Sequence, residues 1–341
     1  MGGLTTMIHT NAHTTFYNPA LLNRQEFALE LTPLTIGLGR DVIDIWDFID
    51  RNEEHFDDLE RIAASDHPDS VQIITDFYRD SEAFDNRWMG AHVSPFFGFA
   101  TRGWGFGIYG NLSADMKIDQ GVFIPAVGAR GYFDVVLGVG HGRVVTIFDR
   151  DWELGAAVRV VQRQQVEPVR VSYSEVRDAT ELGETIREDL EEPKTGFGID
   201  LGMVRTLQWR GNDLDVGVTI QDFIGVLDGW VKPDLKFGAM YSLPIPVYPA
   251  LKRWDLGIEY VDFFNRAGTS VFQKINLGTE LGILNGFLNL RGGFHQGYPT
   301  YGLGLDLYVL KIDYAWFTRE LGTAPGMLGE PTHRVQLSLG W

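Results

Sequence analysis

The sequence has 341 residues, enough for one large domain or two smaller ones, and its hydrophobic content of 44% excludes a disordered chain. A formal charge of −17 is the wrong sign for a surface that follows phosphates, so no nucleic-acid partner is expected. A mean hydropathy of −0.08 without any long apolar run excludes a helical membrane protein but not a closed β-barrel, and the lack of Cys excludes disulfides and thiolate metal sites.

The chain begins Met1-Gly2-Gly3 without a basic and apolar leader, so we expect that any export signal has been removed or never existed. Further along, Pro19 has no N–H and pushes Asn18 toward extended geometry. The chain is therefore expected to turn at this point without forming a strand ladder.

From residue 26 onward, many segments place apolar side chains on every second residue. Near the end of the chain, Val335, Leu337 and Leu339 share one face, whereas Arg334 and Gln336 share the other. This period of two predicts strands with one apolar face. Fourteen such segments are found, an even number, as in single-chain bacterial barrels. They cover residues 26–38, 90–101, 103–118, 122–145, 152–170, 196–209, 214–224, 234–243, 253–265, 271–283, 286–295, 300–308, 310–319 and 333–341.

The lengths of the connections support a barrel over a two-sheet sandwich. In an up-and-down barrel, successive connections alternate between the two ends, with short turns at one end and long loops at the other. The connections after even-numbered strands are tight except for the Pro-rich stretch 244–252, and the long stretches 39–89, 171–195, 225–233 and 320–332 all follow odd-numbered strands. A soluble sandwich has no reason to sort its loops in this way.

Two of the long connections have a helical period. Val42, Ile45, Trp46 and Ile49 have the spacing of one helix face, and residues 175–191 are charged and lack internal Pro. We expect a helical insertion at about 40–89 and a short helical loop at about 173–192, neither of them a separate domain. The first insertion is a solvated lid, a docking surface for another protein, or a segment that folds over the barrel mouth and contacts ligand. Its aromatic side chains are numerous for a loop without contacts. The residues selected for a partner or lid surface are Trp46, Phe56, Phe77 and Trp88.

The two faces of the predicted strands differ in chemistry. Aromatic residues near strand ends are typical of a membrane interface, and they are Trp104, Trp152, Trp209, Trp254, Trp316 and Trp341. The opposite faces carry charges of both signs among many Gly, which predicts a hydrated or ion-paired lumen with room for a plug formed by residues 1–25. The polar residues selected for the lumen are Asp200, Asp215, Glu259, Arg291, Asp306 and Arg334.

The segment from Asn11 to Leu22, followed by a strand beginning near Glu26, resembles the FadL-like outer-membrane transporter superfamily. Members of this superfamily have an N-terminal hatch with an Asn-Pro-Ala motif before the first strand of a fourteen-stranded barrel. The resemblance implies passage of hydrophobic small molecules and a kinked third strand that opens sideways to the bilayer. The tail, with Asp313-Tyr314-Ala315-Trp316 and Glu320-Leu321-Gly322, is similar to the TraF-like and PorV-like branches. The residues matched to the hatch are Asn18, Pro19 and Ala20, continued by Leu21 and Leu22.

Motifs for catalysis, cofactors and metals are weak. The run Gly105–Gly110 satisfies the dinucleotide pattern GxGxxG but lies in an alternating strand with no helix after it. The eight His residues show no metal-binding spacing, and no Ser, His and acid set is selected by its spacing. We expect no enzyme activity, catalytic residue, cofactor or metal.

The sequence thus predicts an all-β protein, a closed antiparallel transmembrane β-barrel over residues 26–341 with a hatch over 1–25, located in the cell outer membrane and in contact with its lipid. The leading functional hypothesis is passive uptake of hydrophobic or amphipathic small molecules through a gated lumen. The alternative is a scaffold that transports nothing and holds a protein partner, through residues 41–88, in a secretion, conjugation or surface assembly. A soluble all-β binding protein is the third hypothesis.

Overall fold

The computed structural model describes residues 1–9, 11–42, 87–119, 126–172, 192–226, 233–245 and 251–340, together with Thr75, Arg79 and Glu82. The helices there are short, and none is long and apolar enough to cross a membrane. They are α1 (Thr14–Tyr17), η1 (Pro19–Arg24), α6 (Val271–Lys274) and η3 (Leu284–Gly286). The strands are β1 (Ala28–Gly39), β2 (Trp88–Val93), β3 (Phe96–Thr101), β4 (Trp104–Asp119), β5 (Ala126–Ile147), β6 (Arg150–Ser172), β7 (Lys194–Trp209), β8 (Asn212–Val226), β9 (Asp234–Pro244), β10 (Leu251–Tyr260), β11 (Ile275–Ile283), β12 (Leu288–His295), β13 (Tyr298–Leu307), β14 (Leu310–Glu320) and β15 (Gly329–Gly340).

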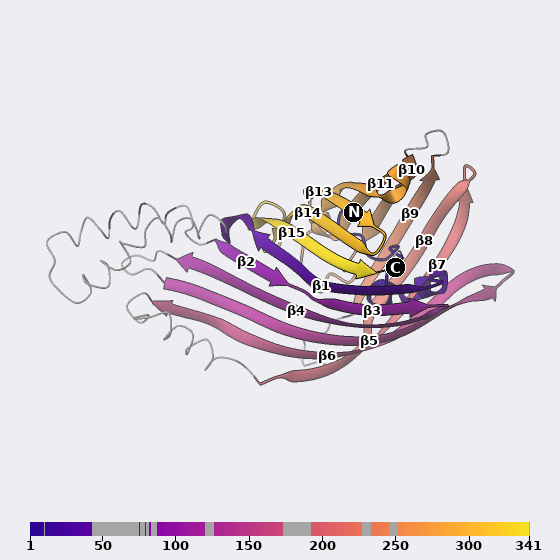
Figure 1. The fold of residues 1–341 in the computed structure, drawn as a ribbon. Coiled ribbons are helices and arrows are strands. Elements are labelled where there is room, and N and C mark those ends of the chain that lie inside the picture. The colour runs from indigo at the N-terminus through magenta and orange to yellow at the C-terminus, as the bar shows by residue number, and fades with distance from the viewer. Residues whose placement is uncertain are drawn as a thin grey trace.

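These strands form one closed antiparallel barrel (Figure 1). From β4 to β15, every strand pairs with its neighbours in the chain, and β15 pairs with β1 from Glu30↔Gly340 to Gly39↔Thr332. Both β2 and β3 lie between β1 and β4, one after the other along the same line, so together they occupy a single strand position of the wall. The wall therefore has the fourteen positions that the sequence predicts, and the pairing of β15 with β1 closes the ring of strands.

The predicted two-residue period matches the two faces of the wall. Apolar side chains on the outer face are exposed, for example Leu112 at 48%, Val158 at 53% and Val335 at 49%. Their alternate neighbours face inward and include buried charged residues such as Asp200 and Asp255. An apolar outer face on a closed barrel fits a location in an outer membrane, where lipid covers that face.

Most tight turns gather at one end of the barrel, as the predicted parity requires, although the two-residue turn Gln296–Gly297 lies at the opposite end. Arg102–Gly103, Phe148–Asp149, Arg210–Gly211 and Tyr308–Val309 each join two adjacent strands, and several of these residues adopt positive φ as two-residue hairpins require. We call this the turn end and the opposite one the loop end. Outward-facing Trp residues lie near the turn end, as an interfacial belt would require, and they are Trp104, Trp152, Trp209 and Trp254.

Two predicted strands are shorter in the structure. The segment 253–265 ends its ladder at Tyr260, after which Asp262 adopts a φ of 48°. The segment 271–283 begins with the helix α6, because Ser270 starts a helical turn in which its amide donates to the side chain of Gln273 at 3.3 Å. A local cap therefore overrides the alternating pattern at the loop end.

The interruption in this part of the wall lies in the second strand. The third strand, β4, pairs with β5 in unbroken register from Trp104↔His141 to Asp119↔Ala126. The second strand breaks between β2 and β3, where Pro95 has no N–H to donate to the ladder. The Ser94 hydroxyl and the Pro95 carbonyl bond the backbone of Gly110 at 2.8 and 3.0 Å, so the polar groups of the break are satisfied.

Candidate functional site

The N-terminal segment, residues 1–9 and 11–25, packs against the inner face of the barrel wall. Asn18 separates its two helical turns and is fully buried. Its side-chain amide donates to the Thr6 carbonyl at 2.9 Å, and its Oδ1 accepts from the Ala20 amide at 3.1 Å. Asn18 therefore caps η1, with Pro19 at the first helical position, and joins two distant parts of the segment.

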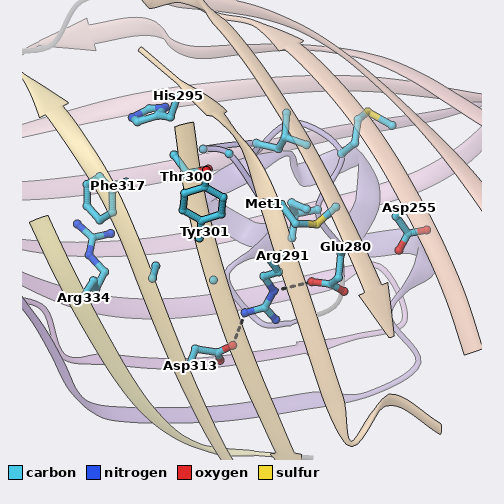
Figure 2. A pocket seen from close by; sticks show the side chains of 18 of the residues that line it. Met1, Asp255, Glu280, Arg291, His295, Thr300, Tyr301, Asp313, Phe317 and Arg334 are labelled. Carbon is cyan, nitrogen blue, oxygen red and sulfur yellow. Dashed lines mark hydrogen bonds and ion pairs between the residues drawn. The ribbon is translucent and has the colours of Figure 1, made fainter. Parts of the chain in front are cut away.

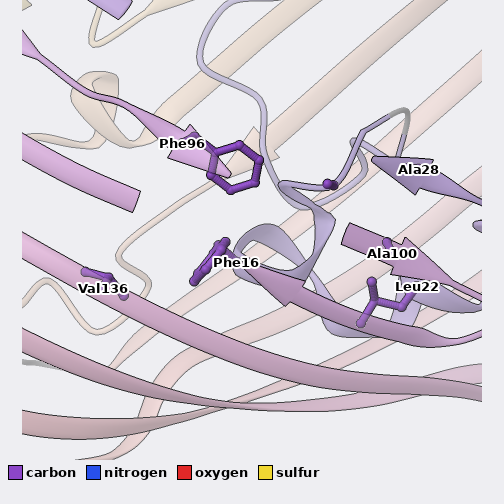
Figure 3. Close-up of a cluster of buried hydrophobic side chains, with 7 residues drawn as sticks. Phe16, Leu22, Ala28, Phe96, Ala100 and Val136 are labelled. Atoms are coloured by element: carbon purple, nitrogen blue, oxygen red, sulfur yellow. The ribbon is translucent and has the colours of Figure 1, made fainter. Parts of the chain in front are cut away.

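Two apolar clusters attach this segment to the wall. The first surrounds Phe16 and contains side chains from both the segment and the barrel (Figure 3), namely Ala12, Phe16, Leu22, Ala28, Phe96, Ala100 and Val136. The second consists of Leu4, Met7, Ala20, Leu21, Val204 and Met240. Leu21 and Leu22 have no exposed surface, so both matched leucines are used in this packing.

Inward-facing glycines allow the close approach. A Cβ on Gly155 of β6 would lie 2.2 Å from the carbonyl carbon of Pro19, and one on Gly202 of β7 would overlap the side chain of Asn18. A Cβ on Gly142 of β5 would meet the Pro19 carbonyl oxygen. Three neighbouring strands thus lack side chains where η1 lies, which explains part of the Gly content of these strands.

Arg24 forms an ionic contact between the segment and the wall. Its Nε donates to both carboxylate oxygens of Glu153 at 2.9 Å, and its Nη1 donates to Asp215 at 2.6 Å. Burial alone would lower the pKa of Arg24, but hydrogen bonds to the two acids raise it, so the guanidinium stays charged. Asp215, selected from the sequence for the lumen, is therefore a partner of the N-terminal segment.

Glu259 forms a second polar contact with the segment. Its carboxylate, on β10, accepts from the amide and hydroxyl of Thr5 at 3.0 and 2.9 Å and from the amide of Thr6 at 2.7 Å. The Thr6 hydroxyl donates to it as well. A buried charge is tolerated here because hydrogen bonds surround it.

On the other side of the segment, the lumen has two adjoining cavities of about 380 and 290 Å³ along the wall from β9 to β15. They share Asn11 of the segment and Arg253, Arg291 and Asp313 of the wall. Figure 2 shows the first cavity, with Arg291 between Glu280 and Asp313. The smaller cavity reaches the turn end at Gly286 and Asp306. The free space of the lumen therefore lies between part of the segment and the strands from β9 to β15.

The lining of the two cavities is largely ion-paired. Arg291 contacts Glu280 at 2.6 Å and also Asp313, and Arg253 contacts Asp255 at 2.5 Å. Asp306 is 3.8 Å from Lys311 near the turn end. These pairs give a hydrated lumen whose charges are mostly balanced within the wall.

Arg334 differs from the other arginines of the lining. Within the described part of the chain, its guanidinium contacts no carboxylate and makes no hydrogen bond; its Cζ lies 5.0 Å from the centre of the Phe317 ring. The side chain is exposed to the first cavity, which Tyr17 and His295 also line.

The remaining selected residues lie elsewhere. Asp200 contacts Arg159 at 2.9 Å, and Arg159 also reaches Asp222 at 2.6 Å, within the wall opposite the cavities. Trp88 begins β2 at the loop end, with the Arg130 guanidinium 4.1 Å from the ring centre. Trp46, Phe56 and Phe77 lie outside the described residues, as do most of the predicted insertion at 40–89 and the predicted helix at 173–192.

Several contacts were not predicted from the sequence, among them those of Arg24, Glu153, Tyr17 and Glu280. Arg24 carried a usable signal, since it is the one charged residue between Pro19 and Gln25. The run Gly105–Gly110 lies in β4, with no helix after it. Among the described residues no cluster of His, Asp and Glu could hold a metal ion.

No protein-family model matches the sequence, and no curated protein matches it. Among solved structures, the chain is similar to the monoaromatic hydrocarbon channel CymD, at 10% identity and a TM-score of 0.46, covering 100% of this chain and 95% of that one. It is also similar to the Pseudomonas putida toluene transporter TodX, at 11% identity and a TM-score of 0.43, with the same coverage. Both are channels of the FadL family, the family that residues Asn18–Ala20 resemble.

A further similar structure is CdiB from Acinetobacter baumannii, at 9% identity and a TM-score of 0.37, covering 93% of this chain. The chain spans about three fifths of the length of CdiB, 60%. Likeness at these levels concerns the barrel fold and carries no statement about substrate.

Proposed function

We propose that this protein is an outer-membrane channel for the passive uptake of small amphipathic molecules, with residues 1–25 as a hatch in its lumen. The observation that carries the proposal is the unequal filling of the lumen. The N-terminal segment packs against β3–β8 and, through residues 1–7, against β9–β12, whereas two adjoining cavities remain beside it along the wall from β9 to β15.

The lining of the cavities supports an amphipathic rather than a purely hydrocarbon solute. Leu4, Met7 and Phe317 contribute apolar surface to the first cavity, and Arg253 and Arg291 are charged. A solute with an apolar body and a polar group can contact both, whereas a neutral hydrocarbon would have to displace water from ion pairs without replacing it.

The hatch is proposed to gate this route by a shift of its middle part. Its ends are fixed by Glu259 at Thr5 and Thr6 and by Glu153 and Asp215 at Arg24. Asn11 lies between these contacts, lines both cavities, and has a buried Oδ1 without a hydrogen-bond partner within the described structure. A small displacement there would widen the passage between the cavities.

A disulfide tests the gate, because the chain contains no Cys of its own. A Cβ on Gly98 of β3 would lie 2.8 Å from the Cβ of Ala12, about 1 Å closer than in an average disulfide, and 2.3 Å from Cζ of Phe96, so the bond requires the Phe96 ring to move. In liposomes containing Ala12→Cys/Gly98→Cys, oxidation should lower the influx of an aryl glucoside at least about fivefold, and a reductant should restore it.

The matched control joins two strands of the wall and forms no covalent bond to the segment, although the Gly140 position contacts Leu22. A Cβ on Gly140 would lie 3.2 Å from that of Ala157, so Gly140→Cys/Ala157→Cys should conduct equally in both redox states. Equal influx through the oxidised and reduced Ala12–Gly98 pair would reject the gate. Liposomes sealed to the glucoside in every state would reject the channel and favour the partner-binding scaffold.

A further inference from the structure

Among the described residues, the wall of the first cavity contains one guanidinium that contacts no carboxylate. The other described arginines of the lining, Arg253 and Arg291, each contact a carboxylate. Arg334 contacts none among the described residues, although it faces the same space. Because its side chain is exposed to this cavity, the Arg334 guanidinium is accessible to an anionic ligand.

The other charges near Arg334 are already neutralised. Arg319 lies on the neighbouring strand β14, opposite Glu330. It contacts Asp115 at 2.6 Å and Glu330 at 2.5 Å. Its Nη1 also lies 2.6 Å from His92 Nε2. The two acids therefore belong to Arg319, and Arg334 is left with the ring of Phe317 and open space.

Two hydroxyl groups without hydrogen bonds line the same cavity. Within the described structure, neither the Tyr17 nor the Thr300 hydroxyl makes a hydrogen bond, and Thr300 is only 7% exposed. Burial raises the pKa of Tyr17 to about 12, although the nearby charge of Arg334 opposes the rise. The phenol therefore stays protonated and can donate a hydrogen bond to an anion.

Building on the channel proposed above, we propose that this cavity contains an anion subsite centred on Arg334, and that its ligand is a small organic carboxylate with a short aromatic or aliphatic body. A guanidinium fork matches a carboxylate with two parallel hydrogen bonds. Phe317, Leu4 and Met7 offer apolar surface to the body of the ligand, and about 380 Å³ is the size of a pocket for a small molecule.

An inorganic anion fits less well, because it would leave the apolar part of the cavity wet. A long acyl chain fits less well because the space beyond Arg334 leads to the ion pairs of Arg291 and Arg253. The size and the lining therefore favour a compact ligand, for which benzoate is a suitable probe.

Calorimetric titration of the full-length protein in detergent tests the subsite. We expect benzoate to bind, Arg334→Gln to weaken binding at least about tenfold, and Arg334→Lys to retain part of it, because an ammonium keeps the charge but not the fork. Lys311→Gln removes the same charge from the turn end of the lumen, where Asp306 is 39% exposed on its side chain, and should change the affinity less than about twofold.

Four results would overturn the subsite. They are no binding of benzoate to the unaltered protein, equal affinity in Arg334→Gln, an equal loss in Lys311→Gln, and displacement of benzoate by an equal concentration of chloride. Benzyl alcohol, which has the same ring without the charge, should bind equally to the unaltered protein and to Arg334→Gln. Heat-dependent migration on electrophoresis verifies that each variant is a folded barrel.

The channel and the subsite can fail separately. Influx of an uncharged aryl glucoside into liposomes reports on the channel and does not require Arg334. Influx without Arg334-dependent benzoate binding would leave the channel and remove the subsite. Binding that depends on Arg334 in a barrel sealed to the glucoside would leave the subsite and remove the channel.

Discussion

At the scale of single residues, Asn18 connects more of the N-terminal segment than either of its neighbours. It is fully buried, and both polar atoms of its side-chain amide form hydrogen bonds with backbone groups of the segment. The resemblance of Asn18-Pro19-Ala20 to a family motif indicated importance but no contact. The hydrogen bonds supply the reason: the uncharged Asn side chain has a separate donor, Nδ2, and acceptor, Oδ1, and both are used here.

Asn18→Ala should loosen the segment without opening the barrel. The substitution leaves the Thr6 carbonyl and the Ala20 amide buried without partners, at a cost of about 1–3 kcal/mol each. Tryptic cleavage after Arg24 in detergent, followed by mass spectrometry of the released peptide, should be at least about tenfold faster. Asn212→Ala removes a hydrogen bond to Tyr241 at the turn end and should leave the cleavage rate unchanged; a similar increase there would contradict the prediction.

At the scale of elements, the contact between η1 and the wall depends on the absence of side chains. Gly142, Gly155 and Gly202 belong to three neighbouring strands, and each is in van der Waals contact with Pro19, Ala20 or Asn18. Arg24, at the end of the same short helix, then reaches Glu153 and Asp215. Shape and charge therefore fix η1 at adjacent points.

Gly155→Ala should displace η1, because the new methyl group would lie 2.2 Å from the Pro19 carbonyl carbon and 2.3 Å from the Ala20 nitrogen. We expect hydrogen–deuterium exchange over residues 14–25 to become at least about tenfold faster, with exchange in β9–β15 unchanged. Gly292→Ala is the control, since its methyl group would meet only Thr279 at 3.6 Å. Unchanged exchange in Gly155→Ala would show that η1 is not held by this contact.

At the scale of the whole molecule, the barrel closes through its own strands. The ladder from β1 to β15 uses no backbone group of residues 1–25. The outer face is apolar, and the inner face is polar enough to be wetted once the segment is absent. The barrel is thus expected to fold whether or not the N-terminal segment fills its lumen.

Deletion of residues 1–20 should leave strand content unchanged by circular dichroism and raise solute influx into liposomes at least about tenfold. Glu259 would lose the hydrogen bonds of Thr5 and Thr6, but water entering the lumen can solvate the freed carboxylate. The full-length chain in the same liposomes is the control. Unchanged influx would mean that the segment does not close the route, and loss of strand content would show that the barrel does not fold without it.

The sequence by itself determined the number of wall positions, the face of most strand residues and the end at which the tight turns gather. These follow from a period of two and from connection length, both of which are local along the chain. It failed where a local rule overrides alternation, as at α6, and where a proline interrupts a ladder, since Pro95 was counted inside one continuous second strand.

Only the tertiary structure decided which inward charges meet and where the lumen is empty. Arg24 and Glu153 are 129 residues apart, and Arg24 and Asp215 are 191 apart. Closure of the barrel and the tilt of its strands bring such residues to the same height along the barrel axis. Neither closure nor tilt can be read from the alternating pattern of a single strand. The same holds for Arg334, which alternation assigns to the lumen, whereas its lack of an acidic partner is a property of the closed barrel.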